Sequence, residues 1–144
     1  MVNFENLKLV ALGNPLLDMQ VRDGQDVLQK YGLKPNDAVL ASPEQLSIYE
    51  HLVENYQVTY VAGGAAQNTA RCAQYALPEG STAYLGCVGN DDLAQQLRAA
   101  NEREGLQSVY QVVNDTPTGS CAVVITGHDR SLCTNLGAAE KFDK

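Results

Sequence analysis

The stretch VAGGAAQNTARCAQYAL, residues 61–77, places two glycines between a strand and a helix. Glycine lets the backbone leave the strand without a Cβ penalty and come close to another group. The unpaired N–H groups of the helix start then face whatever binds there. Gln67 and Asn68 follow in the first helical turn, and they leave two interpretations open: a turn that contacts a ligand, or amides that cap a neighbouring loop. The glycine spacing fits neither a Rossmann fingerprint nor a P-loop.

Strands and helices alternate around this junction. Hydrophobic periodicity predicts strands at 7–13, 16–22, 57–62, 81–89 and 108–113, and helices at 24–32, 42–56, 65–77 and 91–104. The first strand is expected to be buried. The helix at 42–56 is expected to open with a capping box and to bury a stripe of Leu46, Tyr49, Leu52, Val53 and Tyr56.

This alternation favours βαβ units around a largely parallel sheet, and hence the α/β class. An alanine stripe at 66, 70, 73 and 76 predicts close packing of its helix on that sheet. Residues 119–136 form two strand-like runs joined by a Gly-His-Asp turn, so they predict a hairpin with His128 as a turn residue.

Length and charge restrict the class of partner. The chain has 144 residues, enough for one compact domain, and its net charge of -7 comes without a basic cluster, so nucleic acid is not expected. Apolar runs are too short for a membrane span, and the polar N-terminus predicts no secretory signal, so a cytoplasmic or nuclear location is expected. Four widely spaced cysteines predict neither a metal site nor a redox motif, only buried reduced thiols.

Two charged residues are candidates for binding chemistry. Asp18 stands four residues after Asn14 in the stretch GNPLLD. Its carboxylate can accept hydrogen bonds from both hydroxyls of a vicinal diol, and the alternative is a solvated aspartate on an open sheet face. Arg130 lies at the predicted hairpin turn, where a guanidinium can reach an anion or simply pair with Asp129.

Four stretches in order, LGNPLLD, AGGAAQNTARCAQY, GCVGNDDLA and TPTGSCAVVITGHDRSLCTNLGAA, resemble the adenosine kinase family of the ribokinase-like (PfkB) carbohydrate kinases, in its fungal form. The resemblance runs from about Leu9 to Ala139. It implies a three-layer α/β/α core with a small β-sheet lid, of which residues 1–144 are the N-terminal portion. The implied lid strands lie at about 15–23, 37–41, 57–62 and 118–136.

The resemblance also implies an activity: ATP-dependent phosphorylation of the 5′-hydroxyl of adenosine to AMP, with Mg²⁺, in purine salvage. By motif, Asp18 would hold the ribose 2′- and 3′-hydroxyls, and Arg130 would reach the transferred phosphate. The other implied substrate-binding residues are Asn14, Gly63, Gly64 and Asn68 around the nucleoside and its sugar, and Leu16, Cys121 and Leu136 around the base.

The catalytic aspartate and most of the ATP site are expected in a C-terminal part that this sequence does not contain. The chain is therefore expected to show little phosphoryl transfer alone and, because its sheet is incomplete, either to self-associate or to be only partly ordered. Two alternative functions stay open: a non-catalytic nucleoside-binding or lid-mediated interaction module, and a related kinase of another nucleoside or sugar.

Overall fold

The computed structural model describes residues 5–143, and the chain divides into two compact units. Unit 1 comprises the residues up to Leu17, Ala62–Gly119 and the residues from Leu136 onward. Unit 2 comprises Asp18–Val61 and Ser120–Asn135.

A parallel sheet forms the centre of unit 1. Its three strands lie in the order β1 (Leu9–Leu12), β5 (Thr82–Gly89) and β6 (Gln107–Val113), with both neighbouring pairs parallel. Helices α3 (Ala65–Ala76) and α4 (Asp92–Arg103) belong to the same unit, as does the 3-10 helix η2 (Gly137–Lys141). The predicted parallel α/β arrangement is thereby confirmed.

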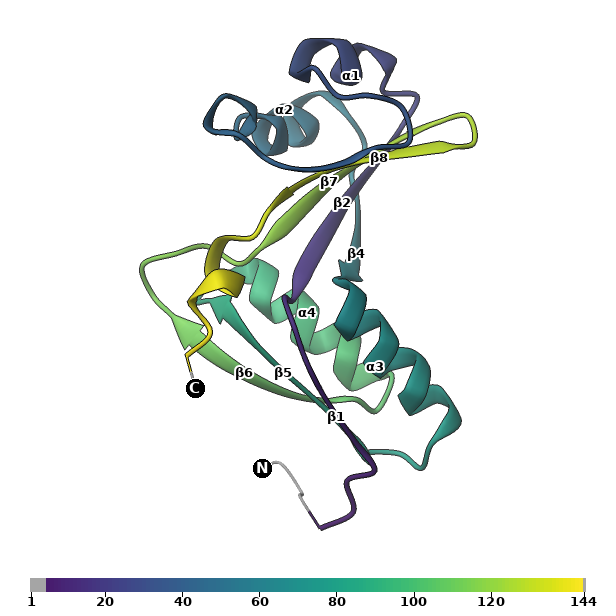
Figure 1. The fold of residues 1–144 in the computed structure, drawn as a ribbon, viewed down its shortest axis with the longest axis vertical. Helices are drawn as coiled ribbons and strands as arrows, with labels where there is room; N and C mark the ends of the chain where they lie inside the picture. Colours follow the sequence, from purple (N-terminus) through teal and green to yellow (C-terminus); the bar gives the residue numbers. More distant parts are fainter. Residues whose placement is uncertain (1–4, 144) are drawn as a thin grey trace. The chain divides into compact units, whose positions relative to one another are not determined.

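Helices α3 and α4 cover the same face of this sheet (Figure 1). Tyr84 and Val88 point to one side of β5, where Tyr84 packs with Ala70 of α3 and Val88 packs with Leu97 of α4. All four side chains are fully buried. The described residues of unit 1 therefore supply two layers of the implied three-layer core.

Strand β1 is an edge strand, and the expectation that it is buried is wrong. Val10 and Leu12 are 57% and 54% exposed, whereas Ala11 packs against the cluster under α3. Alternate side chains of a strand point to opposite faces, and α3 covers only one of them here. The alanine stripe on α3 is likewise shorter than predicted, because Ala70 is buried but Ala76 is exposed.

Most of unit 2 is built on a five-stranded sheet with the order β3-β8-β7-β2-β4. The strands are β2 (Leu16–Arg22), β3 (Ala38–Leu40), β4 (Thr59–Gly63), β7 (Ser120–Thr126) and β8 (Asp129–Asn135). The predicted hairpin is confirmed, because β7 and β8 pair antiparallel around a turn at Gly127 and His128. Helices α1 (Gln25–Tyr31) and α2 (Ile48–Asn55) supply residues to the core of this unit, with Val27, Ile48 and Leu52 fully buried.

The predicted helix at 42–56 is two elements. The capping box of Ser42 and Gln45 is present, but it opens the 3-10 turn η1 (Pro43–Gln45), and α2 begins only at Ile48. The Gln45 amide donates to the Tyr31 carbonyl at 2.8 Å, which ties η1 to the end of α1. Leu52 of the predicted stripe is buried, and Tyr49 and Tyr56 pack against the same cluster, but Leu46 and Val53 are 45% and 54% exposed.

The cysteines are free thiols, and three of them are buried as expected: Cys87, Cys121 and Cys133. The fourth, Cys72, is exposed on α3, so the prediction is wrong there. In the described part of the chain, the helices are too short or too polar to cross a membrane.

Candidate functional site

Gly64, directly after β4, and Gly13, directly after β1, are each required by a neighbouring part of the chain. Gly64 has a φ of +94°, and a Cβ placed on it would lie 2.3 Å from the carbonyl oxygen of Asn14. A Cβ on Gly13 would lie 2.6 Å from the Cβ of Ala66. The loop after β1 and the turn after β4 therefore touch backbone to backbone, which only glycine permits. The Asn14 residue itself is exposed beside this contact, after the carboxyl end of β1.

The two amides of the first α3 turn have different environments. Gln67 is fully buried, and its Nε2 donates to the carbonyl oxygen of Gly63 at 2.8 Å. Asn68 is exposed, with its backbone N–H donating to the Gly64 carbonyl at 2.9 Å and its Oδ1 accepting from Arg71 at 3.4 Å. Gln67 therefore uses its amide to bind the chain's own backbone, as the capping interpretation predicted. The amide of Asn68 lies at the surface instead.

Gln67 also belongs to a buried polar cluster that sequence reasoning missed. Its Oε1 accepts from the Tyr110 hydroxyl and from Asn101 Nδ2, the latter at 3.2 Å. Asn101 is fully buried and also donates to Ser108 Oγ at 2.9 Å. The signal was present in the sequence, because Asn101 continues the inward-facing helical series of Ala94 and Leu97, where an amide needs a partner.

Leu16 and Leu136, both predicted to contact a base, meet at Gly119 within unit 1. A Cβ on Gly119 would lie 2.6 Å from the Leu136 carbonyl oxygen and 2.7 Å from Cδ2 of Leu16. The Gly119 carbonyl accepts from the Leu17 N–H at 2.9 Å. Both leucines are half-buried. The structure therefore brings this predicted pair together around one glycine.

Asp91 fixes the loop that leads to Gly119, and sequence reasoning did not single it out. Its carboxylate accepts from the Thr118 N–H at 2.8 Å, from the Thr118 hydroxyl at 2.6 Å and from the Ala94 N–H at 2.9 Å. Burial favours the neutral carboxyl, but these hydrogen bonds outweigh it and lower the pKa of Asp91. A charged N-cap of α4 thus also anchors the residue before Gly119.

The remaining predicted residues, Asp18, Cys121 and Arg130, lie in unit 2 on β2, β7 and β8. Asp18 is half-buried, Cys121 is buried and Arg130 is exposed. Burial raises the pKa of Asp18, and the positive charge of Arg130 opposes this only in part. Burial also raises the pKa of Cys121 to about 11, while the Thr134 hydroxyl, which donates to its sulfur at 3.1 Å, lowers it. The three predicted residues thus lie close enough to act on one another electrostatically.

The raised pKa of Asp18 predicts how the free energy of unfolding depends on pH. The folded chain binds the proton of the Asp18 carboxyl group more tightly than the unfolded chain does. Ionisation of Asp18 therefore lowers the free energy of unfolding. This loss is absent below the pKa of the unfolded chain and is complete once the pH has risen through the pKa of the folded chain. We expect Asp18→Asn to raise the free energy of unfolding at pH 7, by less than about 1 kcal/mol for a half-exposed group, and to leave it nearly unchanged at pH 3.

Urea unfolding at pH 3, 5 and 7 measures this difference, with Asp129→Asn on the exposed end of β8 as the matched control. A loss of stability in Asp18→Asn at pH 7 would show that the carboxylate is already well compensated in the folded chain.

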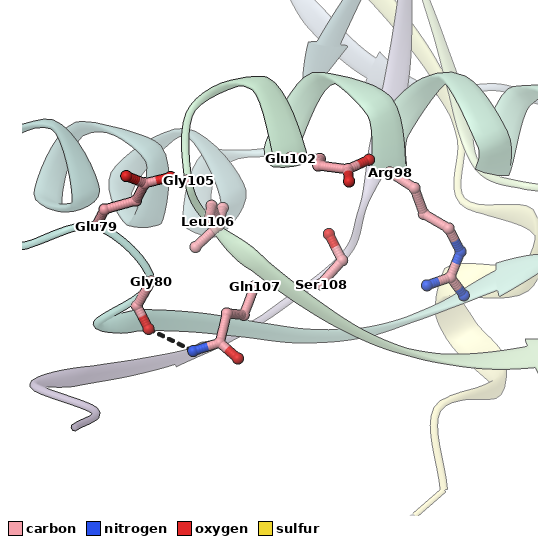
Figure 2. Close-up of a pocket in the computed structure, with 8 residues that line it drawn as sticks. All are labelled: Glu79, Gly80, Arg98, Glu102, Gly105, Leu106, Gln107 and Ser108. Atoms are coloured by element: carbon pink, nitrogen blue, oxygen red, sulfur yellow. Dashed lines mark hydrogen bonds between the residues drawn. The ribbon is translucent and has the colours of Figure 1, made fainter. Parts of the chain in front are cut away.

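A cavity of about 390 Å³ opens elsewhere in unit 1 (Figure 2). Arg98 and Glu102 of α4 line it together with Gln107 and Ser108 at the start of β6, and the Gln107 amide donates to the Gly80 carbonyl. Ligands of parallel sheets bind at the carboxyl ends of the strands. This cavity lies at their amino ends, so it is separate from the candidate site around Asn14.

Comparisons with known proteins identify the relatives of this chain. The pattern of the pfkB family of carbohydrate kinases matches residues 26–144. An adenosine kinase of Schizophyllum commune is 62% identical over 137 residues, which is 95% of this chain and 40% of the relative. An adenosine kinase of Saccharomyces cerevisiae is 49% identical over 138 residues, covering 93% of this chain and 41% of the relative.

Solved structures show the same similarity. The crystal structure of Anopheles gambiae adenosine kinase in complex with P1,P4-di(adenosine-5) tetraphosphate matches with a TM-score of 0.90 and 44% identity, over 94% of this chain and 41% of that one. Schistosoma mansoni adenosine kinase in complex with adenosine matches with a TM-score of 0.86 and 29% identity, over 93% of this chain and 39% of that one. The chain spans about 40% of the length of these relatives. From the family match, which covers more than half of its residues, the chain belongs to the pfkB family of carbohydrate kinases.

Proposed function

We propose that this chain is the nucleoside-recognising part of an adenosine kinase, and that the complete protein phosphorylates the 5′-hydroxyl of adenosine with ATP. The observation that carries the proposal is the 62% identity to the Schizophyllum commune adenosine kinase, which extends over 95% of the chain. Identity at this level over nearly the whole chain favours the same substrate class rather than the fold alone.

Unit 1 contributes the contacts to the sugar and part of the base pocket. Asn68 and the backbone of Gly63 and Gly64 fix the ribose, and the exposed Asn14 lies beside that turn. The half-buried Leu16 and Leu136 pack on the base. The proposal is supported by the two glycine contacts, which hold these residues in fixed backbone positions.

Unit 2 contributes the charged groups. Asp18 accepts the ribose 2′- and 3′-hydroxyls, and the raised pKa of this carboxyl supports the role, since its burial is incompletely compensated until donors bind. Cys121 lines the base pocket as a neutral thiol, because burial raises its pKa to about 11. Arg130 is exposed and contacts the 5′ side, where the phosphoryl group is transferred.

The proposal gives Mg²⁺ and ATP to the complete protein as co-substrate. Among residues 5–143, no group of three or more His, Cys, Asp or Glu side chains could hold a metal ion. The proposed role of the described residues is therefore to hold the nucleoside and, through Arg130, to contact the phosphoryl group.

Competition calorimetry with adenosine, inosine and free ribose tests the proposed substrate class. Adenosine should bind most tightly, because the base pocket and the ribose contacts both contribute. Equal affinity for inosine or for ribose would instead favour the related kinase of another nucleoside or sugar. If none of the three bound while the chain formed a defined oligomer by light scattering, the interaction-module alternative would be preferred.

Arg130→Gln separates the phosphate role from nucleoside binding. We expect the substitution to leave adenosine affinity within about twofold and to weaken AMP binding by roughly fivefold, the effect of one exposed charge-assisted contact of about 1 kcal/mol. Titrations with adenosine and AMP measure both values. In the complete enzyme, the same substitution should lower turnover more than adenosine affinity. A selective loss of adenosine binding would move Arg130 to the nucleoside pocket.

Self-association of the isolated chain follows from the exposed edge of unit 1. Val10 and Leu12 present apolar side chains on β1, and an uncovered edge strand is a template for pairing. We expect Val10→Lys to shift the chain toward monomer in sedimentation velocity, while Val53→Lys, on the equally exposed surface of α2, should not. A monomeric parent chain at high concentration would contradict this.

A further inference from the structure

We propose that Gln67 is a positioning residue that holds the Gly63–Gly64 backbone in its ribose-contacting geometry; this rests on the proposed function. The Gln67 side chain is fully buried, and its Nε2 lies 2.8 Å from the carbonyl oxygen of Gly63. Gly63 is the last residue of β4, and Gly64 follows with a φ of +94°. Two consecutive glycines have little conformational preference of their own, so an external contact must select this geometry.

One side chain ties this turn to two other elements. Gln67 Oε1 accepts from the hydroxyl of Tyr110 on β6 and from Nδ2 of Asn101 on α4, the latter at 3.2 Å. Burial raises the pKa of Tyr110 to about 12, so its hydroxyl remains a donor at neutral pH. The Gly63 carbonyl is thereby connected through Gln67 to the sheet and to the second helix. Both polar ends of the Gln67 amide are hydrogen-bonded in this network, although Asn101 Oδ1 has no partner among residues 5–143, and we expect these bonds to rigidify the turn.

Gln74 on the same helix shows what a purely structural glutamine does. Only 3% of Gln74 is exposed, and its Nε2 donates to the Pro78 carbonyl at 2.9 Å. Its Oε1 accepts from the Thr82 N–H at 2.9 Å. Gln74 thus anchors the end of α3 to the start of β5, about three helical turns away from Gly64. The two glutamines are alike in burial and bonding, and only Gln67 contacts the glycine turn.

Two matched pairs of variants test the inference by adenosine titration. Tyr110→Phe removes the hydroxyl that donates to Gln67, whereas Tyr84→Phe removes a buried hydroxyl that has no hydrogen-bond partner among residues 5–143. We expect Tyr110→Phe to weaken adenosine binding about fivefold and Tyr84→Phe to leave it within twofold. Gln67→Met should weaken binding by more than tenfold, whereas Gln74→Met should lose stability but keep its affinity.

Amide hydrogen exchange provides a second measurement that needs no ligand. It uses only Tyr110→Phe and Tyr84→Phe, each of which removes a single hydroxyl group. The Asn68 N–H donates to the Gly64 carbonyl at 2.9 Å, so its exchange reports on the turn. Tyr110→Phe should accelerate this exchange severalfold relative to Tyr84→Phe. Equal changes in exchange and in affinity within each pair of variants would overturn the inference. The proposed function would not be affected by that result, provided that the parent chain binds adenosine. A parent chain that binds no adenosine would refute the proposed function and with it the ribose role of this turn.

Discussion

Asp18→Ala is expected to weaken adenosine binding by about 30-fold to 1,000-fold, which corresponds to roughly 2–4 kcal/mol. The carboxylate is proposed to accept both ribose hydroxyls, so its loss leaves two buried donors of the ligand without partners. The charge of Arg130, which acts on Asp18 in the parent chain, would also be left uncompensated. Isothermal titration calorimetry of the parent and the variant measures the difference.

The ligand supplies the control for this prediction. For 2′,3′-dideoxyadenosine, which lacks both hydroxyls, Asp18→Ala should cost little, because the contact that it removes is missing already. Asp129→Ala, in an exposed position at the start of β8, should leave both affinities unchanged. An equal loss for adenosine and its dideoxy analogue would contradict the assignment of Asp18 to the diol.

Gly64→Ala is expected to lower the free energy of unfolding by about 2–5 kcal/mol and to remove detectable adenosine binding. The added Cβ would lie 2.3 Å from the Asn14 carbonyl oxygen, so the two backbones must separate. The φ of +94° and ψ of 126° lie outside the left-handed helical region and add strain of about 1–3 kcal/mol for a residue with a side chain. Urea unfolding and an adenosine titration of the same variant measure both effects.

Gly80→Ala separates backbone strain from the steric clash. Gly80 also has a positive φ, +71°, but a Cβ there meets nothing within 4 Å. We expect this control to cost only about 1–2 kcal/mol and to leave adenosine affinity unchanged. If Gly64→Ala were no more damaging than Gly80→Ala, the close contact with Asn14 would not determine the structure of the turn.

The regular elements could be predicted because their periodicity is local. Strand β2 buries Leu17, Met19 and Val21 as its alternation indicates, and α1 ends at Gly32 in the left-handed conformation. Burial of β1 could not be predicted in this way, because exposure of Val10 depends on what covers the second face of the sheet.

The candidate site was predictable only in part for a similar reason. Short motifs marked the candidate residues, and the resemblance assigned their roles. The contacts that hold them come from distant parts of the chain: Asn14 explains Gly64, and Tyr110 and Asn101 explain Gln67. Likewise, the Gln45 contact to Tyr31, which ties η1 to the end of α1, is one that no local pattern reveals. Contacts between residues so far apart in the sequence can be identified only from the three-dimensional structure.

Amide chemical-shift mapping of adenosine binding tests the central claim most directly. The proposed nucleoside contacts predict saturable shifts at Asn14, Gly64 and Asn68 in unit 1 and at Asp18 and Cys121 in unit 2. Residues around the separate cavity, such as Gly80 and Gln107, should not respond. Saturable shifts confined to that cavity, or no saturable shift at any residue, would contradict the account.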